Sequence, residues 1–481
     1  MVRRLAFTAL ATALLSACAV GPDFVKPDMP ASATFARAPA TEASVAPAAA
    51  DAPFWDAFGD PTLSALVADA LRANHDLRIA LANHDQATAL LRGARFDRLP
   101  TITADGQAAD TRSSADQLPG VARDDRDARS YQAGIAASWE LDLFGRIRRS
   151  VEAGTADAEA SAADLRAAQV VVAGDVAAAY VELRGLQERL RVARENRDNQ
   201  QRTLDLVQAR LDAGGASDFD GARARAQLEA TSARIPALEA AEAVAMHRIA
   251  VLTGRTPDAL IATLSQPAPL PVLPARIEPG TPADVLRHRP DVAAAEARLH
   301  AATARIGIAT ADLFPRITLG GLLGTQASAA GALFERDSQT RLVALGIDWS
   351  FLDVGRVRAR IAGADAAGDA ALAHYQQSVL RALQDTEDAL VRLDRARRED
   401  EHLQRAATDS ARAADLARVR FDAGATSLFE MLDVERSRLQ AEDAFADGRS
   451  RSALNAIALY KALAGGWPQS PPARESIADR R

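Results

Sequence analysis

The chain reads Trp139-Glu140-Leu141-Asp142-Leu143-Phe144-Gly145-Arg146 and, 210 residues further on, Trp349-Ser350-Phe351-Leu352-Asp353-Val354-Gly355-Arg356. The same spacing relates Arg210-Leu211-Asp212-Ala213-Gly214 to Arg420-Phe421-Asp422-Ala423-Gly424. Two copies of so long a period do not suit a solenoid of short repeats. They indicate an internal two-fold repeat whose halves work as a pair.

Each copy predicts a strand pair that leads into a very long helix. Residues 131–141 alternate between apolar and small or polar side chains, as a half-exposed strand does, and residues 343–351 repeat the pattern. No proline interrupts residues 145–212 or 355–422. Each of these stretches therefore predicts a helix on the order of 100 Å long.

Prolines and glycines mark where the predicted elements change. The residue before a proline disfavours helical geometry, so a helix should give way to a strand at Pro100 and at Pro315. Gly214 and Gly424 follow the long helices, in the position that glycine favours just past a helix end. The offset is 215 at the prolines and 210 at the glycines, so the second copy is five residues shorter between Pro315 and Trp349.

These signals predict a division of the 481 residues into six parts. They are a signal peptide (1–17), a lipidated extended strap (18–61), a first repeat (62–255), a Pro-rich connector (256–281), a second repeat (282–465) and a disordered tail (466–481). Each repeat is expected to run from a helix through a β-hairpin (about 100–142 and 315–352) and a long helix (about 145–212 and 355–422) to a return helix (about 217–252 and 427–463).

The N-terminus has the pattern of a secretory signal. Arg3 and Arg4 precede an apolar run that ends in Leu15-Ser16-Ala17-Cys18. Cys18 is the only cysteine, and a lone cysteine in an exported protein cannot form an internal disulfide. The order resembles a bacterial lipoprotein box, which implies diacylglycerol and an N-acyl chain on Cys18, and Ala19 after it implies outer-membrane retention. A chance free thiol is the alternative.

Composition limits the partners and the route through a membrane. The formal charge is −7, and it becomes −9 when residues 1–17 with their two arginines are removed, which argues against a nucleic-acid partner. No stretch after the signal has the 18 apolar residues of a spanning helix. A chain of this kind crosses a membrane only as a closed β-barrel, and four strands cannot close one. The sequence therefore predicts an oligomer.

No motif for catalysis, nucleotide binding or metal binding is present. The seven histidines are scattered without a His-Glu-x-x-His pattern, and the chain has no Gly-x-x-x-x-Gly-Lys loop and no Gly-x-Ser-x-Gly elbow. We therefore expect no enzyme activity, no metal site and no cofactor besides the covalent lipid.

Four segments together carry a family resemblance, namely Cys18–Phe24, Phe54–Pro61, Leu141–Gly145 and Arg289–Val292. In this order the chain resembles the TolC-type outer-membrane efflux proteins, in the lipoprotein (NodT/OprM-like) branch that serves resistance-nodulation-division pumps. The resemblance implies an α+β membrane protein and a homotrimer. Each chain would give four strands to a twelve-stranded transmembrane β-barrel, which a long α-helical coiled-coil barrel continues into the periplasm.

The resemblance also implies a function. The protein is expected to be the outer-membrane exit duct of a tripartite efflux pump, passively conducting small toxic compounds or drugs to the exterior of a Gram-negative bacterium. Its partners would be a periplasmic adaptor (membrane fusion) protein, an inner-membrane transporter and outer-membrane lipid. Alternatives are an exit duct for protein secretion or metal-cation efflux, or a lipid-anchored coiled-coil structural protein without a channel.

The resemblance places the turns after the long helices at the periplasmic tip, where Gly214 and Gly424 would contact the adaptor. The residues expected to form the periplasmic gate are Asp220, Phe429, Glu430, Asp433 and Arg436. The first copy has Arg223 and Ala226 opposite Asp433 and Arg436, so this pair is specific to the second copy. The alternative is that these groups are only exposed on a helix near a turn.

The junctions between strands and helices are the remaining candidate positions. Trp139 and Trp349 would either anchor at the membrane interface or pack in the core. Gly145 and Gly355 are expected to be backbone hinges between strand and helix.

Overall fold

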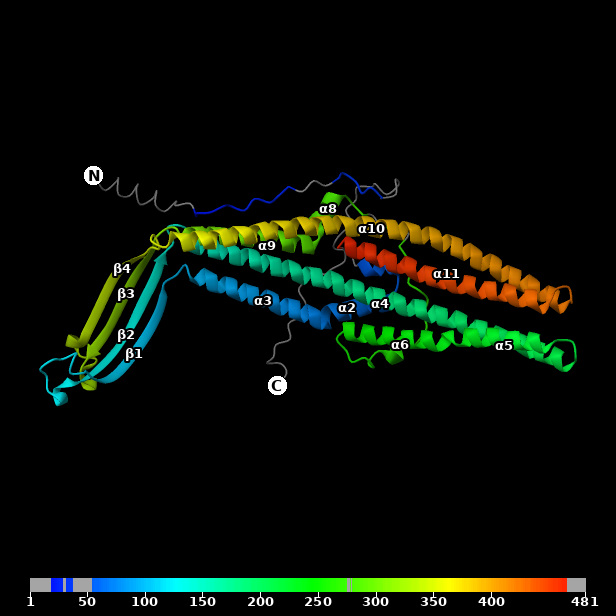
Figure 1. Cartoon of the computed structure of the whole chain (residues 1–481), viewed down its shortest axis with the longest axis horizontal. Helices are drawn as coiled ribbons and strands as arrows, with labels where there is room; N and C mark the ends of the chain where they lie inside the picture. The colour runs from blue at the N-terminus through cyan, green and yellow to red at the C-terminus, as the bar shows by residue number, and fades with distance from the viewer. Residues whose placement is uncertain (1–18, 29–31, 38–53, 275–276, 278, 465–481) are drawn as a thin grey trace. The chain divides into compact units, whose positions relative to one another are not determined.

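The computed structural model describes residues 19–28, 32–37, 54–274, 277 and 279–464 (Figure 1). The expected signal peptide 1–17, the lipidation site Cys18 and the tail 466–481 lie outside these residues. Packing divides the chain into two units. The first holds the residues up to Asp28, His84–Ser161 and Ala294–Gln376, and the second holds the other three segments. Among the described helices, none has the length and apolar character needed to cross a membrane.

The described elements follow the order of the repeat. The helices are η1 (Phe54–Phe58), α2 (Pro61–Ala73), α3 (His75–Phe96), η2 (Arg123–Arg126), α4 (Arg146–Asp212), α5 (Asp218–Ser232), α6 (Arg234–Leu252), α7 (Ile261–Leu264), α8 (Pro282–His288), α9 (Pro290–Ala311), η3 (Ala330–Ala332), η4 (Arg336–Ser338), α10 (Val354–Asp422) and α11 (Leu428–Ala462). The strands are β1 (Thr101–Arg112), β2 (Asp127–Leu141), β3 (Arg316–Ala327) and β4 (Gln339–Asp348).

The four strands form one antiparallel sheet in the order β1-β2-β3-β4, so the hairpins of the two copies pair through β2 and β3 (Figure 1). The strand pattern expected to continue to Phe351 stops at Asp348. The chain turns there, and the N–H of Asp353 donates to the carbonyl of Ser350 over 2.9 Å. Trp349 therefore follows β4, whereas Trp139 lies within β2.

The register gives the sheet one apolar and one polar face, because cross-strand partners point to the same side. The apolar face carries Ile102, Ala104, Ala108, Tyr131, Ile135, Trp139, Leu319, Leu323, Val343, Leu345 and Ile347. The polar face carries Thr101, Thr103, Asp105, Gln107, Gln132, Ser138, Thr318, Gln326 and Thr340. Charged groups on the apolar face gather at the loop end, at Asp110, Arg112, Asp127, Arg129 and Arg341.

The helix expected at the start of the first repeat, from residue 62 toward the hairpin, is interrupted at Asn74. The backbone of Asn74 is extended, and its side-chain oxygen accepts from the N–H groups of Asp76 (2.8 Å) and Leu77 (3.2 Å), which caps α3. The second copy breaks 215 residues later at Arg289, which precedes Pro290 and is extended as well. Both copies therefore contain the same break, formed by different residues.

The first return helix, expected from 217 to 252, is also divided. α5 ends at Ser232 and α6 begins at Arg234. Pro236 lacks an N–H and its ring clashes with the carbonyl four residues earlier, at Ser232. The matching position in the second copy is Ala446, and α11 runs through it without a break.

The second unit is built around α4 and α11, which approach closely. A Cβ on Gly185 of α4 would lie 2.8 Å from the Cβ of Ser450 in α11, so glycine is needed there. The α4 side chains Val176 and Leu183 are fully enclosed within the chain. The large apolar side chains that stay exposed on α10 are Val354, Leu380, Leu416 and Val419.

Candidate functional site

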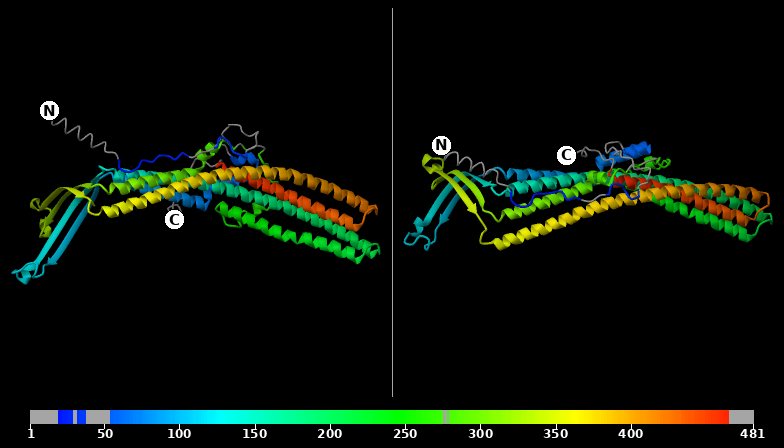
Figure 2. Two further views of the ribbon diagram at one scale, coloured as in Figure 1. Left: turned by 45° about the horizontal axis from the view of Figure 1, so that its top comes forward. Right: turned by 90° about the horizontal axis from the view of Figure 1, so that it is seen from above.

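The long helices α4 and α10 end in matching turns at the same end of the second unit (Figure 2). Gly214 has φ of 74° and Gly424 has φ of 71°, a left-handed conformation that favours glycine. The N–H of Gly215 donates to the carbonyl of Arg210 over 2.7 Å, and the N–H of Ala425 donates to that of Arg420 over 2.8 Å. The glycine pair thus ends the long helices in one identical backbone motif.

Asp220 and Glu430 have a local structural role that the sequence analysis missed. Each carboxylate accepts from the N–H of the serine three residues earlier, Ser217 (3.0 Å) or Ser427 (3.3 Å), and each serine hydroxyl caps the helix in return. Hydrogen bonds from the Ser217 hydroxyl and N–H lower the pKa of Asp220. The Thr426 hydroxyl, followed by the Ser427 N–H, lowers the pKa of Glu430. Both acids are therefore fixed at the first turn as carboxylates.

The remaining gate residues form two separate contacts. Asp433 accepts from Arg436 over 2.6 Å, one turn away on the same helix, and both side chains are about half exposed. Phe429 lies under Arg223 of α5, with 3.9 Å between the guanidinium carbon and the ring centroid. The structure therefore joins the two tips through Phe429 and Arg223, while the Asp433–Arg436 pair stays within α11.

Glu435 is a buried acid beside the tip that sequence reasoning did not single out. It lies on α11 and is only 8% exposed. Burial raises the pKa of its carboxyl, which the charges of Arg438 and Arg418 only partly oppose. A glutamate three residues before an arginine looks like a surface pair in the sequence, so only the packing of α11 shows its burial.

Replacing Glu435 with glutamine is expected to stabilise the protein at high pH. Because the pKa is higher in the folded state, Glu435 destabilises the fold once the pH rises through that pKa, and the effect is absent below the unfolded value. Melting of detergent-solubilised Glu435→Gln and wild type between about pH 4 and 8 should give curves that meet at the acidic end and separate as the pH rises. Parallel curves would contradict this prediction.

The strand–helix junctions contain a second pair of matched bonds. The indole N–H of Trp139 donates to the carbonyl of Arg98 over 3.0 Å, and that of Trp349 donates to the carbonyl of Leu313 over the same distance. Each bond ties the end of a hairpin to the segment just before Pro100 or Pro315. Trp139 is 37% exposed and Trp349 is 52% exposed, so both residues stay accessible while their indole N–H groups are bonded.

The two junction glycines differ. Gly145 has φ of 82° and lies just before α4, as expected for a hinge. Gly355 lies in the first turn of α10 without a positive φ, so its backbone does not require glycine. The hinge therefore has a backbone basis only in the first copy, because α10 begins at Val354, two residues earlier than the match to Arg146 implies.

The residues that directly follow Cys18 are bound to the first junction. The buried guanidinium of Arg149 donates to the carboxylate of Asp23 over 2.6 Å and to the carbonyl of Val20 over 3.2 Å. The N–H of Val20 donates to the carbonyl of Phe144 over 3.2 Å. These contacts place the start of the strap beside the end of β2.

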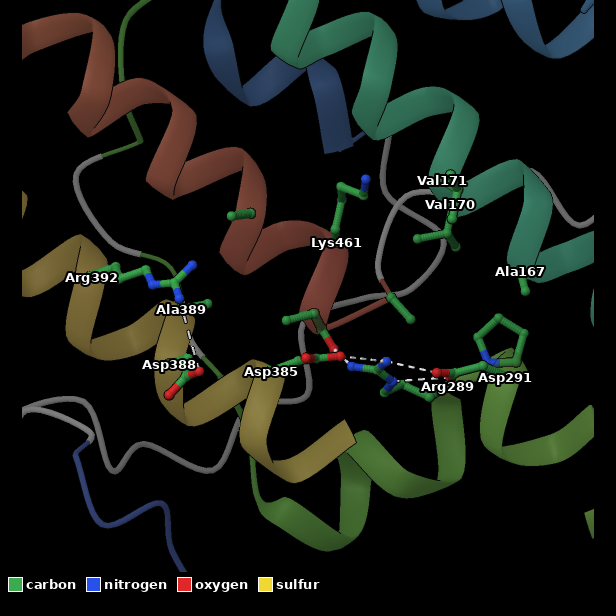
Figure 3. Close-up of a pocket in the computed structure, with 14 residues that line it drawn as sticks. Ala167, Val170, Val171, Arg289, Asp291, Asp385, Asp388, Ala389, Arg392 and Lys461 are labelled. Carbon is green, nitrogen blue, oxygen red and sulfur yellow. Dashed lines mark hydrogen bonds and ion pairs between the residues drawn. The ribbon is translucent and has the colours of Figure 1, made fainter. Parts of the chain in front are cut away.

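A cavity of about 440 Å³ in the second unit contains Arg289 (Figure 3). Its guanidinium donates to Asp291 (2.7 Å), to Asp385 (3.1 Å) and to the carbonyl of Ala462 (3.2 Å). In the first copy the matching residue, Asn74, donates to the carbonyl of Leu252 over 2.9 Å. Both residues thus hold the last carbonyl of a return helix. Among the described residues, no group of three or more His, Cys, Asp or Glu side chains could hold a metal ion.

The family model described as outer membrane efflux protein matches residues 66–255 and 281–465, which is most of both repeats. The chain belongs to the outer membrane efflux protein family. Outer membrane protein OprJ of Pseudomonas aeruginosa is 34% identical over 465 residues, covering 95% of this chain and 94% of OprJ. The toluene efflux pump outer membrane protein TtgI of Pseudomonas putida is 30% identical, covering 95% and 97%.

The solved structures agree with this membership. The outer-membrane channel OprN matches with a TM-score of 0.87 and 39% identity, over 94% of this chain and all of that structure. The predicted fold class of helical barrel plus sheet is confirmed, as are the outer-membrane location and the efflux function. This outer membrane efflux protein is a channel component rather than an enzyme, which excludes the alternative of a coiled-coil protein without a channel.

Proposed function

We propose that this outer membrane efflux protein is the lipid-anchored, trimeric exit duct of a tripartite pump for small toxic compounds. The observation that carries the proposal is the two-faced sheet. The apolar face of β2 runs from Tyr131 to Leu141. At about 3.4 Å per residue and a tilt of about 40°, this is about 26 Å of height, close to the apolar band of about 25 Å of outer-membrane barrels.

The edges of the sheet favour a trimer. Within the described chain β1 and β4 are both edge strands, and the unpaired backbone groups of an edge are not tolerated in lipid. Pairing β4 of one chain with β1 of the next removes every edge. Three chains then give the even number of twelve strands, wide enough to leave a water-filled lumen.

The strap supports a lipid anchor in the inner leaflet. Val20 and Asp23 are bound beside the end of β2, on the side of the sheet where the helices begin. A diacylglycerol and an N-acyl chain on Cys18 would thus enter the membrane at the level of Trp139 and Trp349. Tryptophan is enriched at that interface.

The tips carry the proposed gate and adaptor contact. Phe219 (69% exposed) and Phe429 (55% exposed) stand 210 residues apart beside the turns at Gly214 and Gly424. Exposed aromatic side chains of this kind are enriched where proteins bind one another. We assign this surface to a periplasmic adaptor that joins the duct to an inner-membrane transporter. The name of the relative TtgI supports small apolar toxicants as cargo.

The gate is expected to open when its charges are removed. Under threefold symmetry Glu430 and Asp433 form rings of carboxylates, which divalent cations can bridge. In planar bilayers, Glu430→Gln/Asp433→Asn should raise single-channel conductance about twofold or more and abolish block by divalent cations. Glutamine keeps the helix cap that alanine would remove.

A matched variant separates the gate from a general charge effect. Glu401→Gln/Asp409→Asn makes the same charge change on exposed positions of α10 away from the tip, and it should conduct like the wild type. Unchanged conductance in the Glu430/Asp433 variant would refute the gate. If no variant conducts at all, the proposed channel itself is refuted.

A further inference from the structure

The polar face of the sheet carries one charged side chain away from the strand ends. Within the described strands, Asp105 in β1 is that residue, and the other charged groups on this face, Glu140, Arg316 and Asp348, lie at the helix end. Glu140 is paired with Arg146 over 2.7 Å. In the part of the chain that the structure describes, no basic side chain forms an ion pair with the exposed Asp105.

The row across the sheet leaves this carboxylate uncovered. The cross-strand partners of Asp105 are Gly134, then Gly324, then Thr340. Gly134 has no side chain to cover this carboxylate, and a Cβ built on it would lie 3.7 Å from the carboxylate, in ordinary van der Waals contact. The next row toward the loops holds three neutral amides, Gln107, Gln132 and Gln326. Within the described strands, Asp105 is therefore the one charged residue of the polar face that lies away from the helix end.

We propose that Asp105 makes the membrane segment of the channel selective for cations. This inference rests on the proposed trimer, in which the polar face lines the lumen and Asp105 forms a ring of three carboxylates. Twelve strands spaced about 4.8 Å apart and tilted by about 40° give a radius of about 12 Å. The carboxylates would thus lie about 10 Å from the axis.

Screening decides when such a ring acts. The Debye length is about 30 Å at 0.01 M salt, so the field of the ring reaches the axis, but it is about 3 Å at 1 M, where the field is lost. Cation selectivity from Asp105 must therefore appear at low ionic strength and vanish at high ionic strength. A constriction that binds cations directly would instead stay selective at both low and high ionic strength.

The test uses full-length acylated protein in planar bilayers under a KCl gradient. The background is Glu430→Gln/Asp433→Asn, so that the tip acids do not contribute. Adding Asp105→Asn should lower the ratio of potassium to chloride permeability about three- to tenfold near 0.01 M salt and leave it unchanged near 1 M. Asp105→Lys should reverse the preference toward chloride at low salt.

Asp110→Asn is the matched control, because Asp110 lies in the same strand on the opposite face and is paired with Arg129 over 3.1 Å. It should leave the permeability ratio at the background value. Channels whose ratio is the same with and without Asp105 at low salt would overturn the inference, as would an equal effect of Asp110→Asn. Either result leaves the proposed channel intact, since that proposal fails only if conductance is absent.

Discussion

Replacing Leu323 with arginine is expected to remove most of the folded protein from the outer membrane. Leu323 lies on the apolar face of β3, is 70% exposed and stands directly opposite Arg341 of β4. An arginine facing lipid costs up to about 2–4 kcal/mol per chain, and at this position it would also oppose the like charge of Arg341. Three copies in the proposed trimer would cost about 6–12 kcal/mol, comparable to the whole stability of a typical domain. The folded, heat-modifiable species in outer-membrane fractions measures the loss on a gel.

Leu322→Arg is the control, because it makes the same substitution one residue away on the polar face. An arginine there would face the aqueous lumen, and we expect a loss below about 1 kcal/mol with folded protein near the wild-type level. If both variants are lost to the same extent, the assignment of the two faces is wrong. If Leu322→Arg is the worse of the two, the faces are inverted.

Replacing Arg289 with alanine is expected to destabilise the second unit by about 2–3 kcal/mol. The Arg289 side chain is 10% exposed and holds two carboxylates and the last carbonyl of α11. Breaking a buried ion pair costs about 3–5 kcal/mol. We expect less because Asp291 and Asp385 are 45% and 56% exposed and can return to water. Chemical denaturation followed by circular dichroism measures the difference.

Arg392→Ala tests whether this effect is specific. Arg392 lines the same cavity, but its side chain is 68% exposed and 4.0 Å from Asp388, so its loss should cost less than about 0.5 kcal/mol. The stability of Arg289→Asn is expected to lie between those of Arg289→Ala and the wild type. Asparagine makes the equivalent bond at the matching position in the first copy, but it carries no charge. Equal stability of the Arg289→Ala and Arg392→Ala variants would contradict the role of Arg289.

The long elements could be predicted from the sequence, whereas the interruptions of the helices could not. The run without proline from 145 to 212 and the glycine after it determine α4 locally, and the structure ends that helix at Asp212. The division at Ala233 follows from Pro236, which is visible in the sequence but outweighed by good helix formers on both sides. The break at Asn74 depends on a cap and on a bond to Leu252, which is distant in the sequence.

The candidate site shows the same division between local and tertiary information. The pattern Ser-x-x-Asp or Ser-x-x-Glu at Ser217 and Ser427 is a readable capping box, and it would have explained why Asp220 and Glu430 match. The stacking of Arg223 on Phe429 joins helices from different copies, so no local sequence pattern predicts it. The function of the tips in gating and in adaptor binding stays a prediction.

The unequal return helices give the two copies different mechanical properties. α11 is a single rod of 35 residues, about 52 Å long, with Phe429 at one end and the carbonyl held by Arg289 at the other. Because α11 has no break, a sideways displacement of its tip is transmitted along the helix to the bond between Arg289 and the last carbonyl. The first copy is divided between α5 and α6 at Ala233. A displacement of α5 can therefore be taken up by bending at Ala233 before it reaches the bond at Asn74. The duplicated chain thus combines one continuous return helix with one return helix that can bend at a break.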